Sequence, residues 1–227
     1  MALFPLSAIH SGFSVRKAMT KTWQRKKDYS RRVETRYLRD RILILCEGKR
    51  TEPNYFRKFP LNVELVEIDV KGTGANTLSL VEDAICRGRG AASKGQPYNQ
   101  IWCVFDRDSF PPGNFNRAFK VADENRIHIA YSNQCFELWY LLHYHFNDAA
   151  IKRHEYARRL TRCIKRKYFK NDKKIYDLLK ERQAYAVQNA KKLLSRYNPC
   201  NPEKDDPSTT VHILVETLNE FISGDAT

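Results

Sequence analysis

Three acidic residues follow two apolar segments of the chain, at the point where each segment ends. Glu47 comes directly after the apolar run at residues 41–46, and Asp106 and Asp108 follow a second run at residues 98–105. Carboxylates that lie together repel one another unless a cation neutralises them, and oxygen ligands favour Mg²⁺ or Mn²⁺. Such a cation polarises a phosphodiester and stabilises its leaving oxygen. The residue types therefore indicate a metal site for phosphodiester chemistry.

The two apolar segments have the composition of strands that are buried on both faces. Residues 41–46 (RILILC) and 98–105 (YNQIWCVF) are short and rich in apolar side chains. Further strands are predicted at residues 62–70 and 127–131, and helices at residues 51–59, 76–87 and 115–125. Strands that alternate with helices predict an α/β fold with a mainly parallel sheet flanked by helices.

In a parallel sheet of this kind, ligands bind at the carboxyl ends of the strands. If the strands before Glu47 and Asp106 are neighbours, the three carboxylates meet at one edge of the sheet. Alternation along extended backbone places Asp106 and Asp108 on the same side and turns Arg107 away. Glu47, Asp106 and Asp108 are therefore the predicted metal ligands, and the predicted catalytic residues are these three with Arg107 and Glu137.

The strands are expected to stop near residue 131. Helices are predicted after that point at residues 132–146, 148–167, 172–197 and 206–222. This pattern divides the chain into a basic N-terminal arm at residues 1–40, an α/β core at residues 41–131 and a helical C-terminal extension packed on the core at residues 132–227. The arm is expected to be partly disordered until it meets its partner, and either Met1 or Met19 fits as the start.

The net charge of +14 is concentrated in two segments. Residues 16–50 contain 13 Lys and Arg against 4 Asp and Glu, and residues 152–174 contain 11 against 2. This distribution favours nucleic acid held by basic surfaces on either side of a carboxylate site, although a solvated helix face gives a similar run of charges. The candidate nucleic-acid-binding residues are Lys49, Arg50, Lys152, Arg153, Arg158, Arg159, Arg162, Lys165, Arg166 and Lys167.

Composition excludes several classes of protein. No apolar run approaches the ~20 residues of a membrane-spanning helix, and residues 1–20 lack a signal-peptide pattern, so we expect a cytoplasmic protein with no membrane partner. The six cysteines include no Cys-x-x-Cys pair, which argues against a zinc ribbon or a disulfide framework. Residues 71–74 (KGTG) lack the full P-loop pattern, so nucleotide binding is not expected there. A homo-oligomer is compatible with the sequence.

Longer strings around the acidic residues resemble one family. A Glu-Gly after the first strand and an Asp-x-Asp after a later strand is the arrangement of the TOPRIM domain of topoisomerases, primases and several nucleases. The strings ILCEG (44–48), TEPNYF (51–56), VFDRD (104–108), SN (132–133), CFELW (135–139), LLH (141–143) and PSTTV (207–211) resemble the RloB-like family, in the same order. Lys49-Arg50 replaces a more acidic pair, and Gln134 stands where proline is common.

The resemblance implies a TOPRIM-like, Mg²⁺-dependent nuclease module that cleaves DNA or RNA, transfer RNA included, in anti-phage defence. It also implies an AAA/ABC-type ATPase, encoded nearby, that restrains or triggers the nuclease. Two alternatives stay open. One is a non-catalytic nucleic-acid-binding or ATPase-partner module with a structural cation. The other is primase-like or topoisomerase-like transfer, although the chain is short for the separate domain that carries a topoisomerase's nucleophilic tyrosine.

Four further side chains have two interpretations each. Arg107 is predicted to contact the scissile phosphate rather than to pair with an acid. Glu137 is predicted to act in the site, because a charge among large apolar residues needs a partner, and it shares a helix face with Asn133 at a spacing of four. Glu52 fits metal assistance as well as it fits capping of its own helix. His143 is predicted to be a core histidine.

Overall fold

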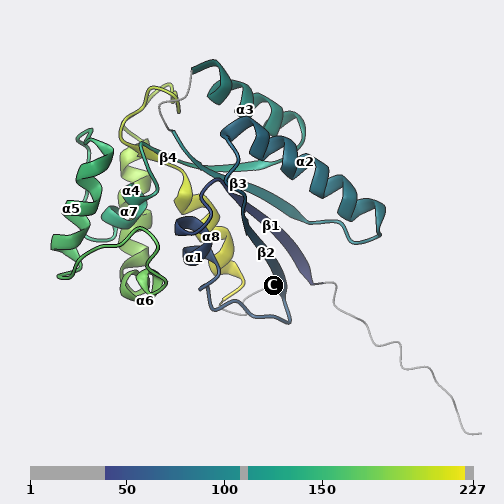
Figure 1. The fold of residues 1–227 in the computed structure, drawn as a ribbon, viewed down its shortest axis with the longest axis horizontal. Helices are drawn as coiled ribbons and strands as arrows, with labels where there is room; N and C mark the ends of the chain where they lie inside the picture. Colours follow the sequence, from purple (N-terminus) through teal and green to yellow (C-terminus); the bar gives the residue numbers. More distant parts are fainter. Residues whose placement is uncertain (1–38, 108–111, 223–227) are drawn as a thin grey trace, which may run out of the picture. The chain divides into compact units, whose positions relative to one another are not determined.

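The computed structural model describes residues 39–107 and 112–222, and a five-stranded sheet of order β2-β1-β3-β4-β5 lies at its centre (Figure 1). The strands are β1 (Asp40–Cys46), β2 (Val66–Gly72), β3 (Gln100–Asp106), β4 (His128–Asn133) and β5 (Ser208–Thr209). The first four run parallel, and β5 pairs antiparallel with β4. The predicted TOPRIM-like α/β class, with a mainly parallel sheet flanked by helices, is confirmed.

Alternate residues of β1 face opposite sides of the sheet. Ile42 and Ile44 belong to one apolar core, while Leu43 and Leu45 belong to the other, and all four are fully buried. The second core lies under α2 (Thr77–Ser93) and α3 (Pro112–Glu124), which Figure 1 shows on one face of the sheet. The first core lies on the other face, and the helices that contribute to it are α1 (Thr51–Phe56), α4 (Glu137–Leu142), α5 (Arg153–Cys163), α6 (Ile175–Leu179), α7 (Gln183–Leu194) and α8 (Val211–Glu220).

The segments after residue 131 differ from their predictions. Residues 132–133 continue β4 rather than begin a helix, and α4 spans only Glu137–Leu142. The helix predicted at residues 206–222 begins at Val211, because residues 208–209 form β5. The reason is a tertiary contact. The Thr209 hydroxyl donates to the Tyr131 carbonyl at 2.8 Å and lies 2.9 Å from the Ser132 hydroxyl. Sheet pairing overrides the local helix signal.

A turn at residues 73–74, directly after β2, holds the loop that follows β1. The Gly74 amide donates to the Glu47 carbonyl at 2.9 Å, and the Thr73 amide donates to the Cys46 carbonyl at 2.9 Å. A Cβ on Gly72 would lie 2.6 Å from the Gly48 carbonyl oxygen, so only glycine lets the two loops approach this closely. The turn therefore fixes the backbone on which Glu47 stands.

Two further predictions concern the basic N-terminal arm and the lack of a membrane-spanning helix. Residues 1–38, most of the predicted basic arm, lie outside the described residues. Within residues 39–107 and 112–222, the longest apolar helices fall short of the length and apolarity that a bilayer span requires.

Candidate active site

Glu47 and Asp106 meet at the carboxyl ends of neighbouring strands. β1 pairs with β3 through Cys46 and Val104, and the Glu47 amide continues this pairing by donating to the Val104 carbonyl at 2.8 Å. The Asp106 amide in turn donates to Glu47 Oε2 at 3.1 Å. The structure thus brings together two of the three predicted metal ligands. The third, Asp108, lies outside the described residues, and its place stays a prediction.

Glu52 and Glu137 extend this pair to a group of four carboxylates. Glu52 lies on α1 and is 5% exposed, and its Oε2 has no hydrogen-bond partner among residues 39–107 and 112–222. Glu137 is the first residue of α4 and accepts a hydrogen bond from the Tyr168 hydroxyl at 3.0 Å. Both carboxylates act electrostatically on Asp106, so the four side chains form one acidic cluster.

Burial and mutual repulsion raise the pKa values of three members of this cluster. The pKa of Asp106 is raised well above its usual value by burial, then by the charges of Glu52 and Glu137. Burial is also the largest cause of the raised pKa of Glu47 and of Glu52. Full ionisation of the cluster therefore requires added positive charge.

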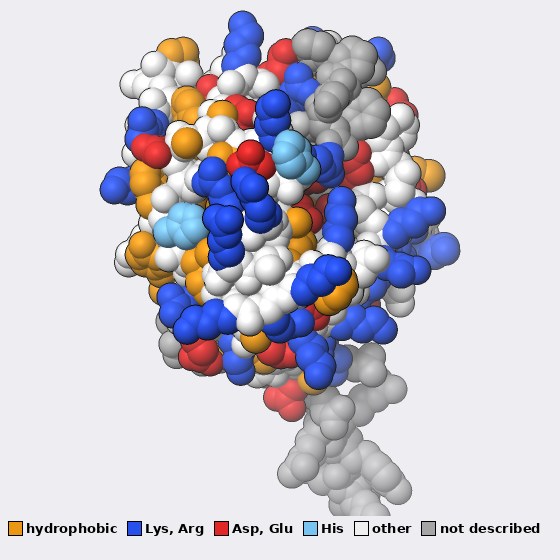
Figure 2. All heavy atoms as spheres, turned by 60° about the vertical axis from the view of Figure 1, so that its left-hand side comes forward, with side chains coloured by type: hydrophobic (Ala, Val, Ile, Leu, Met, Phe, Trp, Pro, Cys, Tyr) orange, Lys and Arg blue, Asp and Glu red, His pale blue; other side chains and the backbone are white. Residues whose placement is uncertain are grey.

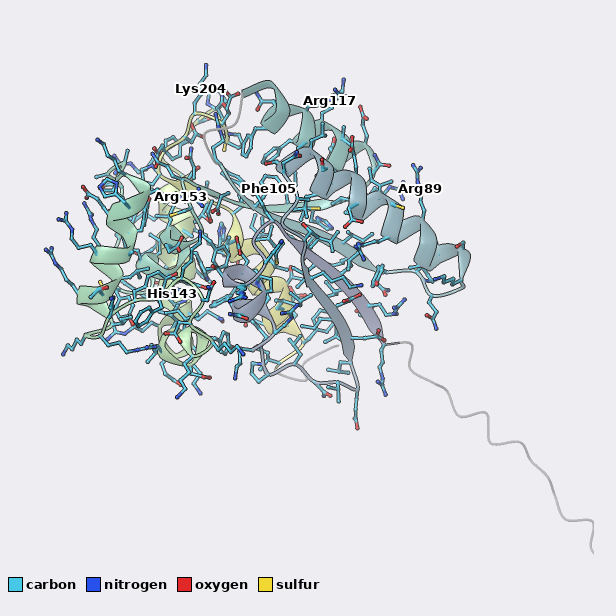
Figure 3. All side chains as sticks on the ribbon, in the orientation of Figure 1. Arg89, Phe105, Arg117, His143, Arg153 and Lys204 are labelled. Atoms are coloured by element: carbon cyan, nitrogen blue, oxygen red, sulfur yellow. The ribbon has the colours of Figure 1, made fainter. Side chains whose placement is uncertain are left out.

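Arg153 supplies part of that positive charge. It is the first residue of α5, and its Nη2 donates to Asp106 Oδ2 at 3.0 Å in an ion pair. Figure 3 labels Arg153 between α5 and the strand ends. The same guanidinium, together with Lys170, also opposes the rise in the pKa of Glu47. A cation from the helical part of the chain thus reaches the carboxylates of the sheet.

A cavity of about 320 Å³ contains the centre of this arrangement. Its acidic side is formed by Glu47, Glu52 and Asp106. Its basic side is formed by Lys49, Arg50, Arg153 and Lys170. Two further cavities share Arg153 with this one. One, of about 370 Å³, is also lined by Arg107, and the other, of about 190 Å³, is also lined by Glu137. The cavity has the charge pattern of a site that takes a cation and a phosphate together.

The donor atoms of the cluster suit a divalent cation. Glu52 Oε2 and Asp106 Oδ1 are buried carboxylate oxygens that no described group satisfies by a hydrogen bond, and hard oxygen donors favour Mg²⁺ or Mn²⁺. In the described part of the chain, however, no three Asp, Glu, His or Cys side chains already converge as a set of metal ligands. A complete ligand set requires a further donor, and the adjacent Asp108 is the predicted one.

Comparison with known proteins identifies the family. A family model described as RloB-like protein matches residues 42–218. The chain belongs to the RloB-like family. No curated protein matches the chain, and no solved structure does. The strings around Glu47 and Asp106 all fall inside the matched range.

Three residues of this RloB-like chain that the sequence analysis considered, Arg107, Asn133 and His143, lie away from the cluster. Arg107 lies with its guanidinium carbon 5.3 Å from the centre of the Phe115 ring and lines the cavity of about 370 Å³, not the one that holds Glu47. Asn133 ends β4, and its side chain donates to the Asp205 carbonyl at 2.9 Å. The prediction that Asn133 shares a helix face with Glu137 is therefore wrong. His143 is fully buried, and its Nδ1 lies 2.9 Å from the Trp139 carbonyl oxygen, as a core histidine does.

The predicted nucleic-acid-binding residues of the RloB-like chain fall into two groups. Lys49, Arg50 and Arg153 line the carboxylate cavity. The others are Lys152, directly before α5, and residues on α5 and on the loop at residues 164–174. Figure 2 shows Lys and Arg side chains gathered over the face that carries these segments. In this second group Arg159 donates to Asn147 and Arg166 pairs with Asp172, while exposed side chains belong to Lys152, Arg158, Arg162, Lys165, Arg166 and Lys167.

Two contributors to the site lie in the basic segment at residues 152–174 but were not among the predicted site residues. Lys170 lines the carboxylate cavity, and its carbonyl accepts a hydrogen bond from the Thr51 hydroxyl at 2.8 Å. Tyr168, which donates to Glu137, is one of several aromatic residues in the basic segment. Their distance in sequence from Glu47 and Asp106 hides both contacts, because no periodicity links a loop between helices to a strand end.

Proposed function

We propose that this RloB-like chain is a metal-dependent nuclease that cleaves phosphodiester bonds of DNA or RNA. The observation that carries the proposal is the cluster of Glu47, Glu52, Asp106 and Glu137, which holds two buried carboxylate oxygens without hydrogen-bond partners among the described residues. Lys49, Arg50 and Lys170 line a cavity together with Glu47, Glu52 and Asp106. Carboxylates and cations that line one small cavity fit the needs of phosphoryl chemistry, in which a metal ion and a polyanion bind side by side.

The residues have distinct roles in this proposal. Glu47 and Asp106, with Asp108, hold Mg²⁺ or Mn²⁺. When bound, the cation polarises the phosphodiester and stabilises the leaving oxygen. Lys49 and Lys170 hold the substrate's phosphates against the cavity. Glu52, whose carboxyl has a raised pKa because of burial, is placed to accept a proton at Oε2 from the attacking water.

Cleavage assays with conservative variants test this function. Single- and double-stranded DNA and RNA, transfer RNA included, are incubated with the full chain and Mg²⁺ or Mn²⁺. Glu47→Gln and Asp106→Asn should each reduce the cleavage rate by about 100-fold or more, because each removes a charged ligand while keeping the side chain's size. Glu181→Gln is the matched control, since that side chain is 85% exposed and is not among the residues that line the cavity. Metal-dependent cleavage that persists undiminished in both site variants would refute the proposal.

One contact favours a second candidate function. Arg153 already neutralises Asp106 by an ion pair at 3.0 Å, as in a module whose carboxylates are structural. A non-catalytic nucleic-acid-binding or ATPase-partner module would bind nucleic acid without turnover, both alone and with an AAA/ABC-type ATPase. The defence role, the partner ATPase and a cytoplasmic location belong to the same proposal and rest on the family. Fragmentation of nucleic acid in cells that express the wild-type chain, but not Glu47→Gln, would support the nuclease.

A further inference from the structure

Arg153 lines all three cavities of the candidate site. It begins α5 directly after the exposed Lys152. Its side chain is 40% exposed, whereas the Asp106 side chain with which it pairs is 9% exposed. A buried carboxylate is thus held by a cation that keeps contact with solvent.

The ion pair occupies one oxygen of a proposed metal ligand. Arg153 binds Asp106 Oδ2, while Asp106 Oδ1 is buried without a hydrogen-bond partner among the described residues. A divalent cation at Asp106 would meet the guanidinium charge at close range, and like charges at such a distance disfavour each other. Metal binding and the Arg153 contact therefore compete for one carboxylate.

A guanidinium released from Asp106 has an evident second partner. Its planar fork of donors matches two oxygens of a phosphate, and the cavities that Arg153 borders are those with the cationic lining. Lysine at the same place would supply the charge without the fork. The position of Arg153 and its guanidinium therefore suit a side chain that binds first Asp106 and then a phosphate.

We propose that Arg153 is an exchangeable counter-ion, which neutralises Asp106 in the metal-free protein and binds the substrate's phosphate when a divalent cation takes Asp106. This inference rests on the proposed function. It predicts that Arg153 opposes metal binding and yet supports cleavage. A residue that only binds nucleic acid would leave the metal affinity unchanged.

The test measures Mn²⁺ affinity of the full chain without nucleic acid, by electron paramagnetic resonance or calorimetry. Arg153→Gln should bind Mn²⁺ at least about 5-fold more tightly than wild type, the lower end of ordinary coupling between two ligands of one site. Its thermal midpoint in EDTA should fall, because Asp106 loses its partner. Its Mn²⁺-dependent cleavage should also fall. Lys152→Gln, which removes the same charge one residue earlier, should leave the Mn²⁺ affinity within about twofold.

Two further arms keep the inference distinct from the proposed function. Arg153→Lys keeps a cation for Asp106, so its Mn²⁺ affinity should stay near wild type while cleavage drops by about 10-fold for the lost fork. Wild-type cleavage by this variant would overturn the phosphate half of the inference. Arg153→Gln that binds Mn²⁺ no more tightly than Lys152→Gln would overturn the counter-ion half, even if the wild-type chain is a nuclease. Tighter Mn²⁺ binding by Arg153→Gln, with no cleavage by wild type, would support the counter-ion and reject the nuclease.

Discussion

Gly48 follows Glu47 at a position where a side chain would collide with the Glu52 carboxylate. A Cβ there would lie 2.0 Å from Glu52 Oε2 and 2.7 Å from its carboxyl carbon, so the Glu52 carboxylate lies directly against the loop after β1. The Glu-Gly pair therefore positions two carboxylates: Glu47 supplies its own, and Gly48 leaves space for that of Glu52. The clashing atoms are the end of a side chain, so added volume at this position displaces Glu52 rather than the backbone.

Gly48→Ala should leave the fold intact and damage the site. We expect the Glu52 carboxylate to turn out of the cavity and the cleavage rate to drop by about 10-fold or more, as when a proton-transferring group is misplaced. Gly90→Ala is the control, because no atom lies within 4 Å of the added Cβ and the position is inside α2. This control should raise the free energy of unfolding by up to about 1 kcal/mol with cleavage unchanged. Full cleavage activity of Gly48→Ala would show that Glu52 has no part in the reaction.

The loop between α5 and α6 connects the helical part of the chain to the carboxylates. The Tyr168 amide donates to the Thr161 hydroxyl at 3.1 Å, and the Tyr168 hydroxyl donates to Glu137 Oε1 at 3.0 Å. Two residues later, the Lys170 carbonyl accepts from Thr51 at the start of α1. These contacts fix the loop on both α4 and α1, and so hold Lys170 at the cavity.

Tyr168→Phe tests this connection at little change in volume. Removal of the hydroxyl leaves a buried carboxylate oxygen of Glu137 without its donor, which should lower the free energy of unfolding by about 1–3 kcal/mol. Urea unfolding of the full chain measures the change. Tyr185→Phe, at a side chain on α7 that is 45% exposed, should have a midpoint equal to that of wild type. Equal midpoints for both variants would mean that the Tyr168 hydroxyl does not stabilise Glu137.

The elements differ in how far the sequence predicts them, for physical reasons. β1 and β3 are predictable because burial on both faces requires continuous apolar runs, and the carboxyl ends of such strands lie at one edge of the sheet. The Arg153 contact and β5 are not predictable, because each depends on a partner far away in the sequence. For Arg153 the basic composition predicts a nucleic-acid contact, whereas the structure adds an ion pair within the site.

At the scale of the whole molecule, the acidic cluster couples stability to pH. The folded-state pKa values of Glu47, Glu52 and Asp106 lie above those of an unfolded chain, chiefly because of burial. Between the unfolded and the folded pKa of each group, the folded protein binds more protons than the unfolded protein. The free energy of unfolding therefore falls as pH rises through this interval.

Mg²⁺ should offset this loss by replacing the protons. We expect the rise in thermal midpoint on adding Mg²⁺ in place of EDTA to be larger at about pH 8 than at about pH 5, because the ionised cluster binds the cation more strongly. His143 acts in the opposite direction. Burial lowers the pKa of His143 to about 4, so its contribution to the free energy of unfolding is lost as pH falls below the pKa of the unfolded chain. This loss is the same in Mg²⁺ and in EDTA, so it does not change the difference between the two midpoints. A midpoint difference independent of pH would mean that the cluster does not bind the metal.

The side chains around the cavity enter the chain in a fixed order during synthesis, from Glu47 and Asp106 to Glu137, Arg153 and finally Lys170. A ribosome releases the strand ends, together with Lys49 and Arg50, well before Arg153 and Lys170, and β5 follows later still. Truncated translation products that end before residue 153 carry the carboxylates with Lys49 and Arg50 but without Arg153 and Lys170. A cell that makes this protein therefore meets the complete cavity only after translation has passed Lys170 and its neighbour Asn171, which separates synthesis of the chain from assembly of this cavity.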